Sequence, residues 1–281
     1  DRSSELRLDT PVEKARRGTV GLFYYDREKV AERRRPESTA TLTDYGNAYA
    51  ENWAIFGAVE YDLTDRLTAR AEVRYQEDTI GVDYTTGTTY ETTYDSVTPR
   101  FTLNYDASDD VMLYGVIAQG NKPGYINTAA SLPENIRYAE EEESWNYELG
   151  AKTTLLDGRL QLNGAVYYID WTNQQLSDSV FVNGVPQSVV TNAGESEVKG
   201  VEIDSQWLAT DYLSFSLGYA YADAQLTDYC DPVQGSELTG FDCVNSDGIA
   251  GGQVAGNQIP NAPKHHLVIS SEFNYPLLRG G

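Results

Sequence analysis

Segments of strict polar and apolar alternation double back through short acidic turns, and this pattern constrains the fold more than any other feature of the chain. The clearest case joins residues 53–62 to residues 67–77 through Leu63-Thr64-Asp65-Arg66. In the second arm one face holds Arg66, Thr68, Arg70, Glu72, Arg74 and Gln76, and the other holds Leu67, Ala69, Ala71, Val73 and Tyr75. A period of two predicts a β-strand with one wet and one dry face.

The same alternation predicts about eleven strands, most of them about ten to thirteen residues long. They fall at residues 4–10, 18–27, 53–62, 67–77, 97–105, 111–119, 145–153, 159–171, 198–208, 212–223 and 264–275. Tight turns join them at one end, as at Asp157-Gly158. Polar segments join them at the other end, at residues 28–51, 81–94, 120–142, 172–197 and 224–260. Segment 28–51 is predicted to be a loop because it is rich in Arg and Glu, whereas 81–94 is predicted to extend its strands.

Short turns that alternate with long loops are typical of a transmembrane β-barrel. Mean hydropathy is only −0.48, and no stretch approaches the roughly 18–20 apolar residues of a membrane helix. Barrel strands need only about ten alternating residues, so low hydropathy does not exclude them. A soluble β-sandwich shows the same alternation, but its strands usually run about five or six residues. The predicted fold class is therefore all-β, a transmembrane antiparallel up-and-down β-barrel.

An odd number of strands has a structural consequence. Bacterial single-chain barrels have an even number, and an open first or last edge leaves backbone groups unpaired in lipid. We therefore expect further strands from elsewhere to close the barrel. Because the chain begins with Asp1 and shows no signal peptide, it is expected to be a piece of a longer protein.

The net charge of −22 makes a nucleic-acid partner improbable, because such a field repels phosphates. The acidic residues are concentrated in the predicted loops, such as Glu140 to Glu143. Two interpretations stay open at this stage: a solvated loop surface, or recruitment of cations.

The two cysteines, Cys230 and Cys243, lie in one polar loop and are predicted to form a disulfide, which indicates an oxidising compartment. The only histidines, His265 and His266, are adjacent and face opposite sides of a strand, so they cannot converge on a zinc ion. We expect them to be structural. No catalytic constellation, metal site or cofactor site is recognisable, and no enzyme activity is predicted.

Several motifs in the chain resemble those of a known family. They are Ser4-Glu5-Leu6-Arg7-Leu8, Asn121-Lys122-Pro123-Gly124-Tyr125-Ile126-Asn127, Glu143 to Lys152, Asn192-Ala193-Gly194 with Lys199-Gly200-Val201-Glu202, and Pro260 to Lys264. Together, and in this order, they resemble the barrel of TonB-dependent outer-membrane receptors of the siderophore-receptor type. One departure is Tyr138-Ala139-Glu140-Glu141-Glu142, where members of the family often carry a proline.

The resemblance implies a 22-stranded plugged barrel, of which residues 1–281 are about half, with the plug domain and the closing strands absent. It implies the outer membrane of a Gram-negative bacterium, contact with outer-membrane lipid, and TonB-energised uptake of a scarce nutrient. A ferric siderophore is expected, while cobalamin and glycans stay open. Haem is disfavoured because the outer loops lack histidine. The implied protein partners are the plug of the same full-length chain and the TonB complex, reached through an N-terminal part. The alternative is a secreted soluble β-rich binding or adhesion module.

Two groups of residues are candidate sites. Lys122, Tyr125 and Asn127 sit where strand meets loop, so they either contact the ligand or order the loop. Inward-facing Arg66, Arg70, Arg74 and Arg100 are predicted to face carboxylates of the plug.

Overall fold

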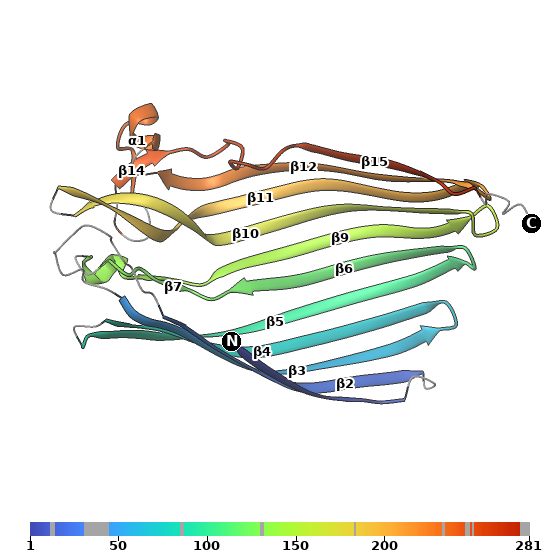
Figure 1. Cartoon of the computed structure of the whole chain (residues 1–281), viewed down its shortest axis with the longest axis horizontal. Coiled ribbons are helices and arrows are strands. Elements are labelled where there is room, and N and C mark those ends of the chain that lie inside the picture. Colours follow the sequence, from blue (N-terminus) through green and yellow to red (C-terminus); the bar gives the residue numbers. More distant parts are fainter. Residues whose placement is uncertain are drawn as a thin grey trace, which may run out of the picture.

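The computed structural model describes residues 1–11, 15–30, 45–84, 87–129, 132–182, 184–231, 234–244, 248 and 250–275. Its main element is a 13-stranded antiparallel sheet (Figure 1). Apart from the short β13 and β14, the sheet consists of eleven long strands in chain order, as the sequence predicts. They are β1 Arg2–Asp9, β2 Arg16–Val30, β3 Tyr45–Thr64, β4 Leu67–Tyr84, β5 Thr89–Ser108, β6 Val111–Lys122, β9 Glu142–Leu155, β10 Leu160–Val182, β11 Val185–Thr210, β12 Leu213–Asp231 and β15 His265–Phe273.

Short elements occur only in two of the long connections of the described chain. Between β6 and β9 lie β7 Tyr125–Ile126, a 3-10 helix Glu134–Ile136 and β8 Tyr138–Ala139. Between β12 and β15 lie α1 Gln234–Thr239, β13 Cys243–Val244 and β14 Ala250–Gln253. Among the described residues, no helix has the length and apolar character needed to cross a bilayer.

Short turns lie at one end of the sheet and long connections at the other (Figure 1, right and left). The turns between β3 and β4, β5 and β6, β9 and β10, and β11 and β12 match the predicted positions. In the remaining short connection, between β1 and β2, residues 12–14 lie outside the described part of the chain. The alternating asymmetry read from the sequence is therefore confirmed at the described turns.

Two predicted loops contain strand in their described parts. β2 continues to Val30 and β3 already begins at Tyr45, so the flanks of segment 28–51 pair with each other. Segment 172–197 was likewise predicted as a loop, yet β10 and β11 pair through most of it. These predictions were wrong because charge and polarity exclude residues from a face in lipid, not from a hairpin that rises into water. The strand extension predicted for 81–94 is confirmed by β4 and β5. Residues 31–44 lie outside the described chain.

The register places apolar and polar side chains on opposite faces of the sheet. The apolar face exposes Leu6, Leu22, Ile55, Val59, Val73, Phe101, Leu103, Ile117, Leu149, Val166, Leu267 and Ile269 among others. On the polar face, aromatic rings lie over glycines of the neighbouring strand. A methyl group at Gly150 would overlap the Tyr114 ring, and one at Gly200 would overlap the Tyr167 ring. These glycines let the strands carry bulky rings without separating.

The small clusters of buried hydrophobic residues lie at the loop end, where strand ends pack against the long connections. One groups Leu132 and Ile136 with Val180 and Val189, and two others involve the ends of β4 and β12. The packed core of the described chain therefore supports the long connections.

Candidate functional site

Charged side chains on the polar face of β2 to β5 form a chain of ion pairs, called here the arginine ladder: Arg17, Glu60, Arg70, Glu72 and Arg100. Arg17 Nε lies 2.6 Å from Glu60 Oε1. Arg70 bridges Glu60 Oε2 at 3.3 Å and Glu72 Oε1 at 2.8 Å. Arg100 Nε is 3.7 Å from Glu72 Oε2. Strand alternation brings these residues together, since each occupies the same face as its cross-strand neighbour.

Of the four predicted arginines, Arg70 and Arg100 are in the ladder, while the other two differ. Arg74 lies on the same face; its Nε donates to Gln76 Oε1 at 2.7 Å, and its guanidinium stacks over the Phe23 ring at 5.2 Å. Arg66 lies in the turn between β3 and β4, where its Nη1 donates to the Ala107 carbonyl near the end of β5 at 3.4 Å. Arg70, Arg74 and Arg100 therefore line the polar face, and Arg66 lies in a turn at the end of that face.

The connection between β6 and β9 lies between the β4–β5 hairpin and the β10–β11 hairpin. Its residues 123–141 are called here the bridge. Ile126 packs on the extended ends of β4 and β5. On the other side, Leu132 and Ile136 pack on the β10–β11 hairpin. Figure 1 shows β7 and the short helix between these two hairpins at the left of the sheet. Contacts on both sides fix the bridge across the loop end.

Asn127 ties the bridge to β11. Only 3% of this residue is exposed. Its Nδ2 donates to Ile136 O at 2.9 Å and to Val190 O at 2.8 Å, and its Oδ1 accepts from Val190 N at 2.7 Å. Backbone groups satisfy this buried amide. Of the two roles considered for Asn127, its position therefore supports ordering of the loop and not contact with a ligand.

Arg137 is the central residue inside the bridge. It is only 2% exposed, and its guanidinium lies 4.2 Å from the centre of the Tyr90 ring. Its Nη1 donates to Asn127 O and to Ala129 O, both at 3.1 Å, and its Nη2 donates to Leu132 O at 2.6 Å. Carbonyl groups thus solvate a buried cation, which holds the turn of the bridge around the side chain.

Side chains from the β10–β11 hairpin hold the second half of the bridge. Asn192 Oδ1 accepts from Glu140 N at 2.6 Å, and its Nδ2 donates to Glu140 O at 2.9 Å. Gln175 Nε2 donates to Pro123 O at 2.9 Å. Tyr94, from β5, donates to Ala139 O at 2.8 Å. The bridge is therefore bonded to strands on both sides of it.

The other two predicted ligand residues have different surroundings. Lys122 Nζ lies 3.1 Å from Glu142 Oε2, so its charge is paired. Tyr125 is 45% exposed. The preceding residue, Gly124, packs so closely on the Tyr94 ring that a side chain at this position would overlap the ring. Since Ile126 points to the β4–β5 wall, Tyr125, on the other side of β7, points away from that wall.

The entire chain, residues 1–281, matches the family model described as TonB dependent receptor-like, beta-barrel. The chain belongs to this family. The match confirms the resemblance seen in the motifs.

Relatives of the receptor barrel are similar over part of their length. The pesticin receptor of Yersinia enterocolitica is 28% identical over 188 residues, which are 64% of this chain and 27% of that protein. The probable TonB-dependent siderophore receptor PiuA of Acinetobacter baumannii is 24% identical over 184 residues, 64% of this chain and 22% of that protein. The chain thus spans about a quarter of the length of these curated relatives.

Solved structures show the same fold. The ferric yersiniabactin uptake receptor FyuA from Yersinia pestis superimposes with a TM-score of 0.74 at 19% identity, covering 99% of this chain and 40% of that chain. The siderophore receptor PiuA from Acinetobacter baumannii gives 0.69 at 17% identity, covering 96% and 43%. The predicted all-β barrel architecture is confirmed, with β1 and β15 as open edges of the sheet.

Aromatic residues border the apolar face of the receptor barrel at both ends. At the loop end Trp53 and Tyr75 contact each other edge to face, with centroids 5.5 Å apart. At the turn end Tyr212 and Tyr275 have centroids 5.0 Å apart. A hollow of about 910 Å³ is lined largely by apolar-face residues such as Phe101. It belongs to the outward surface of the barrel, because rings and apolar side chains in this arrangement face lipid.

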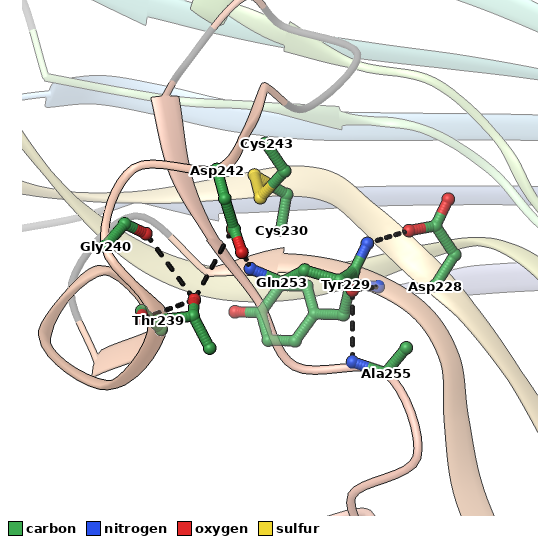
Figure 2. Close-up of a disulfide and its surroundings, with 10 residues drawn as sticks. Asp228, Tyr229, Cys230, Thr239, Gly240, Asp242, Cys243, Gln253 and Ala255 are labelled. Carbon is green, nitrogen blue, oxygen red and sulfur yellow. Dashed lines mark hydrogen bonds between the residues drawn. A yellow bond between two sulfur atoms is a disulfide. The ribbon is translucent and has the colours of Figure 1, made fainter.

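A disulfide braces the connection between β12 and β15 (Figure 2). The Sγ atoms of Cys230 and Cys243 are bonded, with the Cα atoms 5.8 Å apart. Gln253 lies beside the disulfide; its Oε1 accepts from Tyr229 N at 3.0 Å, and its Nε2 donates to Asp228 Oδ1 at 2.7 Å. Gln253 therefore holds the backbone beside Cys230 with hydrogen bonds, in addition to the disulfide.

The two histidines occupy opposite faces, as their adjacency predicts. His265 stacks on Tyr219, with Nδ1 3.0 Å from the Tyr219 hydroxyl, while His266 lines a hollow on the polar face. Within the described ranges, no group of three or more His, Cys, Asp or Glu side chains is arranged to hold a metal ion.

Arg137 of the bridge, and Asn192 and Gln175 of the β10–β11 hairpin that hold it, were missed as candidates. One signal was present in the sequence: Ile126, Leu132 and Ile136 are apolar residues inside a polar segment, where a solvated loop does not need them. Their partners lie on β4 and β5 for Ile126 and on β10 and β11 for the other two, and the local sequence pattern does not identify these partners.

Proposed function

We propose that the chain is part of an outer-membrane receptor that takes up a ferric siderophore in a TonB-dependent manner. The observation that carries this proposal is the family barrel itself, with its polar face inside, its apolar face outside and a folded bridge at one end. Relatives named as receptors for pesticin and for siderophores support an iron chelate as cargo. Membership of the family and the exposed apolar band argue against a secreted soluble module.

In this proposal, residues 1–281 form part of one barrel domain, and further strands pair with β1 and β15. The arginine ladder and Arg74 face the plug domain of the same full-length protein, where they meet its carboxylates. The short turns lie on the periplasmic side, where the TonB complex acts, and the bridge lies on the extracellular side. The location is the outer membrane of a Gram-negative bacterium, and we propose no catalytic step.

Tyr125 is the bridge residue best placed to touch a ligand, because it is exposed and its backbone is held on both sides. Lys122 contributes together with Glu142, as a pair and not as a lone cation. For Asn127 we propose a role in holding Tyr125 in place, without contact to the ligand.

Uptake by cells tests the proposal. Deletion of the full-length gene should abolish uptake of at least one radiolabelled ferric chelate under iron limitation, and the gene should restore it. The protein should fractionate with outer membranes and migrate on gels in a heat-modifiable way. Recovery of the full-length protein as a soluble monomer, or unchanged uptake of every chelate after deletion, would contradict the proposal.

A further inference from the structure

One tryptophan points into the interior of the barrel, while the other three lie on the apolar face. This is Trp171, which β10 places on the polar face together with Tyr167, because its register with β9 is unbroken from residue 160 to residue 172. It is partly exposed. The three outward tryptophans each contact another ring of the apolar face: Trp53 with Tyr75, Trp145 with Tyr147 and Trp207 with Phe215.

The side chains beside Trp171 are small. Directly opposite it lie Ser144 on β9 and Ser196 on β11, and the same row of the sheet continues to Gly120 on β6. Among the described residues Trp171 has no ring contact and no hydrogen bond, so its indole N–H has no acceptor there. The indole therefore has room for a flat partner and a free donor to offer it.

The next row of the polar face, toward the turns, is apolar as well. Ile169 and Val198 lie opposite each other in it, two residues from the row of Trp171. We call Ile169, Trp171 and Val198 the lumen patch. On β6 and β9 to β12 neither row carries a charged side chain, and the first charged neighbour is Arg100 on β5, opposite Ala118. An apolar patch on an otherwise polar surface is typical of a contact site.

Two buried oxygens beside Trp171 lack a hydrogen-bond partner. Ser196, opposite Trp171, is 0% exposed, and Gln174, just past the bulge in β10, is 8% exposed. Neither Ser196 Oγ nor Gln174 Oε1 has a partner in the described part of the chain. Buried polar atoms in proteins are nearly always paired. These two oxygens are therefore acceptors for a polar group that enters between the indole and β11.

The lumen patch lies in the mouth, the loop end of the barrel interior, below the bridge. Tyr168, on the apolar face, lines the hollow that faces lipid. Trp171 follows three residues later on β10, about 10 Å farther toward the loop end. Four residues beyond Trp171, Gln175 Nε2 donates to the Pro123 carbonyl of the bridge at 2.9 Å. A ligand held under the bridge would therefore rest at the level of Trp171.

We infer that Trp171 is the contact for a ring-bearing part of the ferric chelate, on the polar face beneath the bridge. This inference deepens the proposed function and rests on it. The indole stacks on an aromatic ring of the chelator, and Ile169 and Val198 extend the apolar contact. The indole N–H, Ser196 Oγ and Gln174 Oε1 serve polar atoms of the same ligand. Chelates without a ring lose the stacking, so the site favours chelates that have one.

Fluorescence quenching tests the position of the indole without any ligand. The full-length receptor is reconstituted in phosphatidylcholine vesicles, with acrylamide as the aqueous quencher and brominated acyl chains as the quencher in lipid. W171F should remove emission that acrylamide quenches, whereas W207F, on the apolar face, should remove emission that the brominated chains quench. If the emission lost in W171F is reached by neither quencher, the plug covers the ring and the inference is wrong. It is also wrong if that emission is quenched from the lipid.

Binding tests the preference. The full-length receptor is titrated with ferric enterobactin and ferric yersiniabactin, whose chelators carry aromatic rings, and with ring-free ferrichrome and ferric citrate. For a ring-bearing chelate that binds, W171A should raise the Kd about five- to tenfold, the size of one aromatic contact, and W171F should restore most of the affinity. The Kd of a ring-free chelate should change less than about twofold. W207A is the matched control, and heat-modifiable migration of W171A shows that the barrel still folds.

The outcomes separate this inference from the function on which it rests. An unchanged Kd in W171A, or an equal loss for both classes of chelate, would overturn the inference and leave the proposed function standing. Binding of ring-free chelates alone to the unaltered receptor would do the same. If none of a wider set of ferric chelates binds and uptake is also unaffected by deletion, the proposed function fails and the inference with it, even where acrylamide reaches Trp171.

Discussion

Asn127 and Val190 bond to each other through both ends of one amide, with Nδ2 donating to the Val190 carbonyl at 2.8 Å and Oδ1 accepting from the Val190 N–H at 2.7 Å. The side chain imitates a strand pairing with β11 from a residue that is not itself in the sheet. One side chain therefore docks this part of the bridge on β11 with bonds like those of a backbone.

Replacing Asn127 by Ala should release the bridge. The lost bonds leave Val190 and Ile136 backbone groups unpaired, which costs about 1–3 kcal/mol for each buried group. Amide hydrogen exchange of residues 123–141 should accelerate, while the strands stay protected. Y125A is the control, because an exposed side chain two positions away makes no such bonds. Equal protection in N127A and the unaltered protein would contradict the role assigned to Asn127.

Gly150→Ala should destabilise the barrel because the new methyl group overlaps the Tyr114 ring on the next strand. We expect a loss of about 1–3 kcal/mol, as for overpacking of a well-packed site, measured as a lower urea midpoint of the full-length protein in detergent. G218A is the matched control, since no atom lies within 4 Å of that position. Combining G150A with Y114A should recover part of the loss.

Arg70→Gln should weaken the arginine ladder without breaking it. Glu60 keeps Arg17 and Glu72 keeps Arg100, so the remaining charges stay partnered. Because Arg70 is partly exposed, we expect a loss of only about 0.5–1 kcal/mol, smaller at high salt. Urea unfolding at two salt concentrations measures it. R66Q, in a turn, should have no comparable effect, and an equal loss there would argue that general charge and not the ladder is responsible.

Acidification should tighten the loop end through Asp78. Burial is the main cause that raises the pKa of Asp78 above its ordinary value of 3.8, although hydrogen bonds from Asn52 and Gln76 oppose it. With the folded pKa above the unfolded one, the folded state binds more protons, so stability rises as the pH falls through the raised pKa toward 3.8. Hydrogen exchange of β4 and the bridge, followed downward from neutral pH, measures this.

The D78N variant is the control for that pH dependence. It keeps the shape of the side chain but has no proton to gain, so the gain in protection should be smaller than in the unaltered protein. A gain of the same size in D78N would assign the effect to other carboxyl groups, Glu141 among them.

Reduction of the Cys230–Cys243 disulfide should loosen its own loop and little else. The link closes a loop with a sequence separation of 13, for which chain entropy gives about 3 kcal/mol. Limited proteolysis should cut between these residues in C230S/C243S and not in the oxidised protein. Q253A should produce a weaker form of the same change, because Gln253 restrains neighbouring backbone. Protection of the strands serves as the internal reference.

Strand order and the two faces were predictable because lipid imposes a period of two on every crossing. Residues 67–77 show this, since each predicted polar side chain of β4 lies on the polar face in the observed register, with Arg66 in the adjoining turn. The upper hairpins were not predictable, because above the membrane both faces meet water and the alternation loses its meaning. The pairing of Val180 with Gln187 in the β10–β11 hairpin is an example.

The candidate site was predictable only in part. Lys122, Tyr125 and Asn127 were placed correctly at the junction of strand and loop, but their different surroundings depend on residues far along the chain. Asn127 is buried because Val190, 63 residues away, supplies its partner. The disulfide was the easier prediction, since two cysteines in one loop leave one pairing.

The bridge also has a consequence for the order of folding. Its bonds join Tyr94 to Ala139 across 45 residues, Gln175 to Pro123 across 52, and Asn127 to Val190 across 63. Contacts so distant in sequence form slowly, because the loop between the partners has to close first. The strands of β4 to β6 and β9 to β11 pair with their immediate neighbours and need no such closure. The mouth should therefore be the last region to become native, after the wall that carries it is in place.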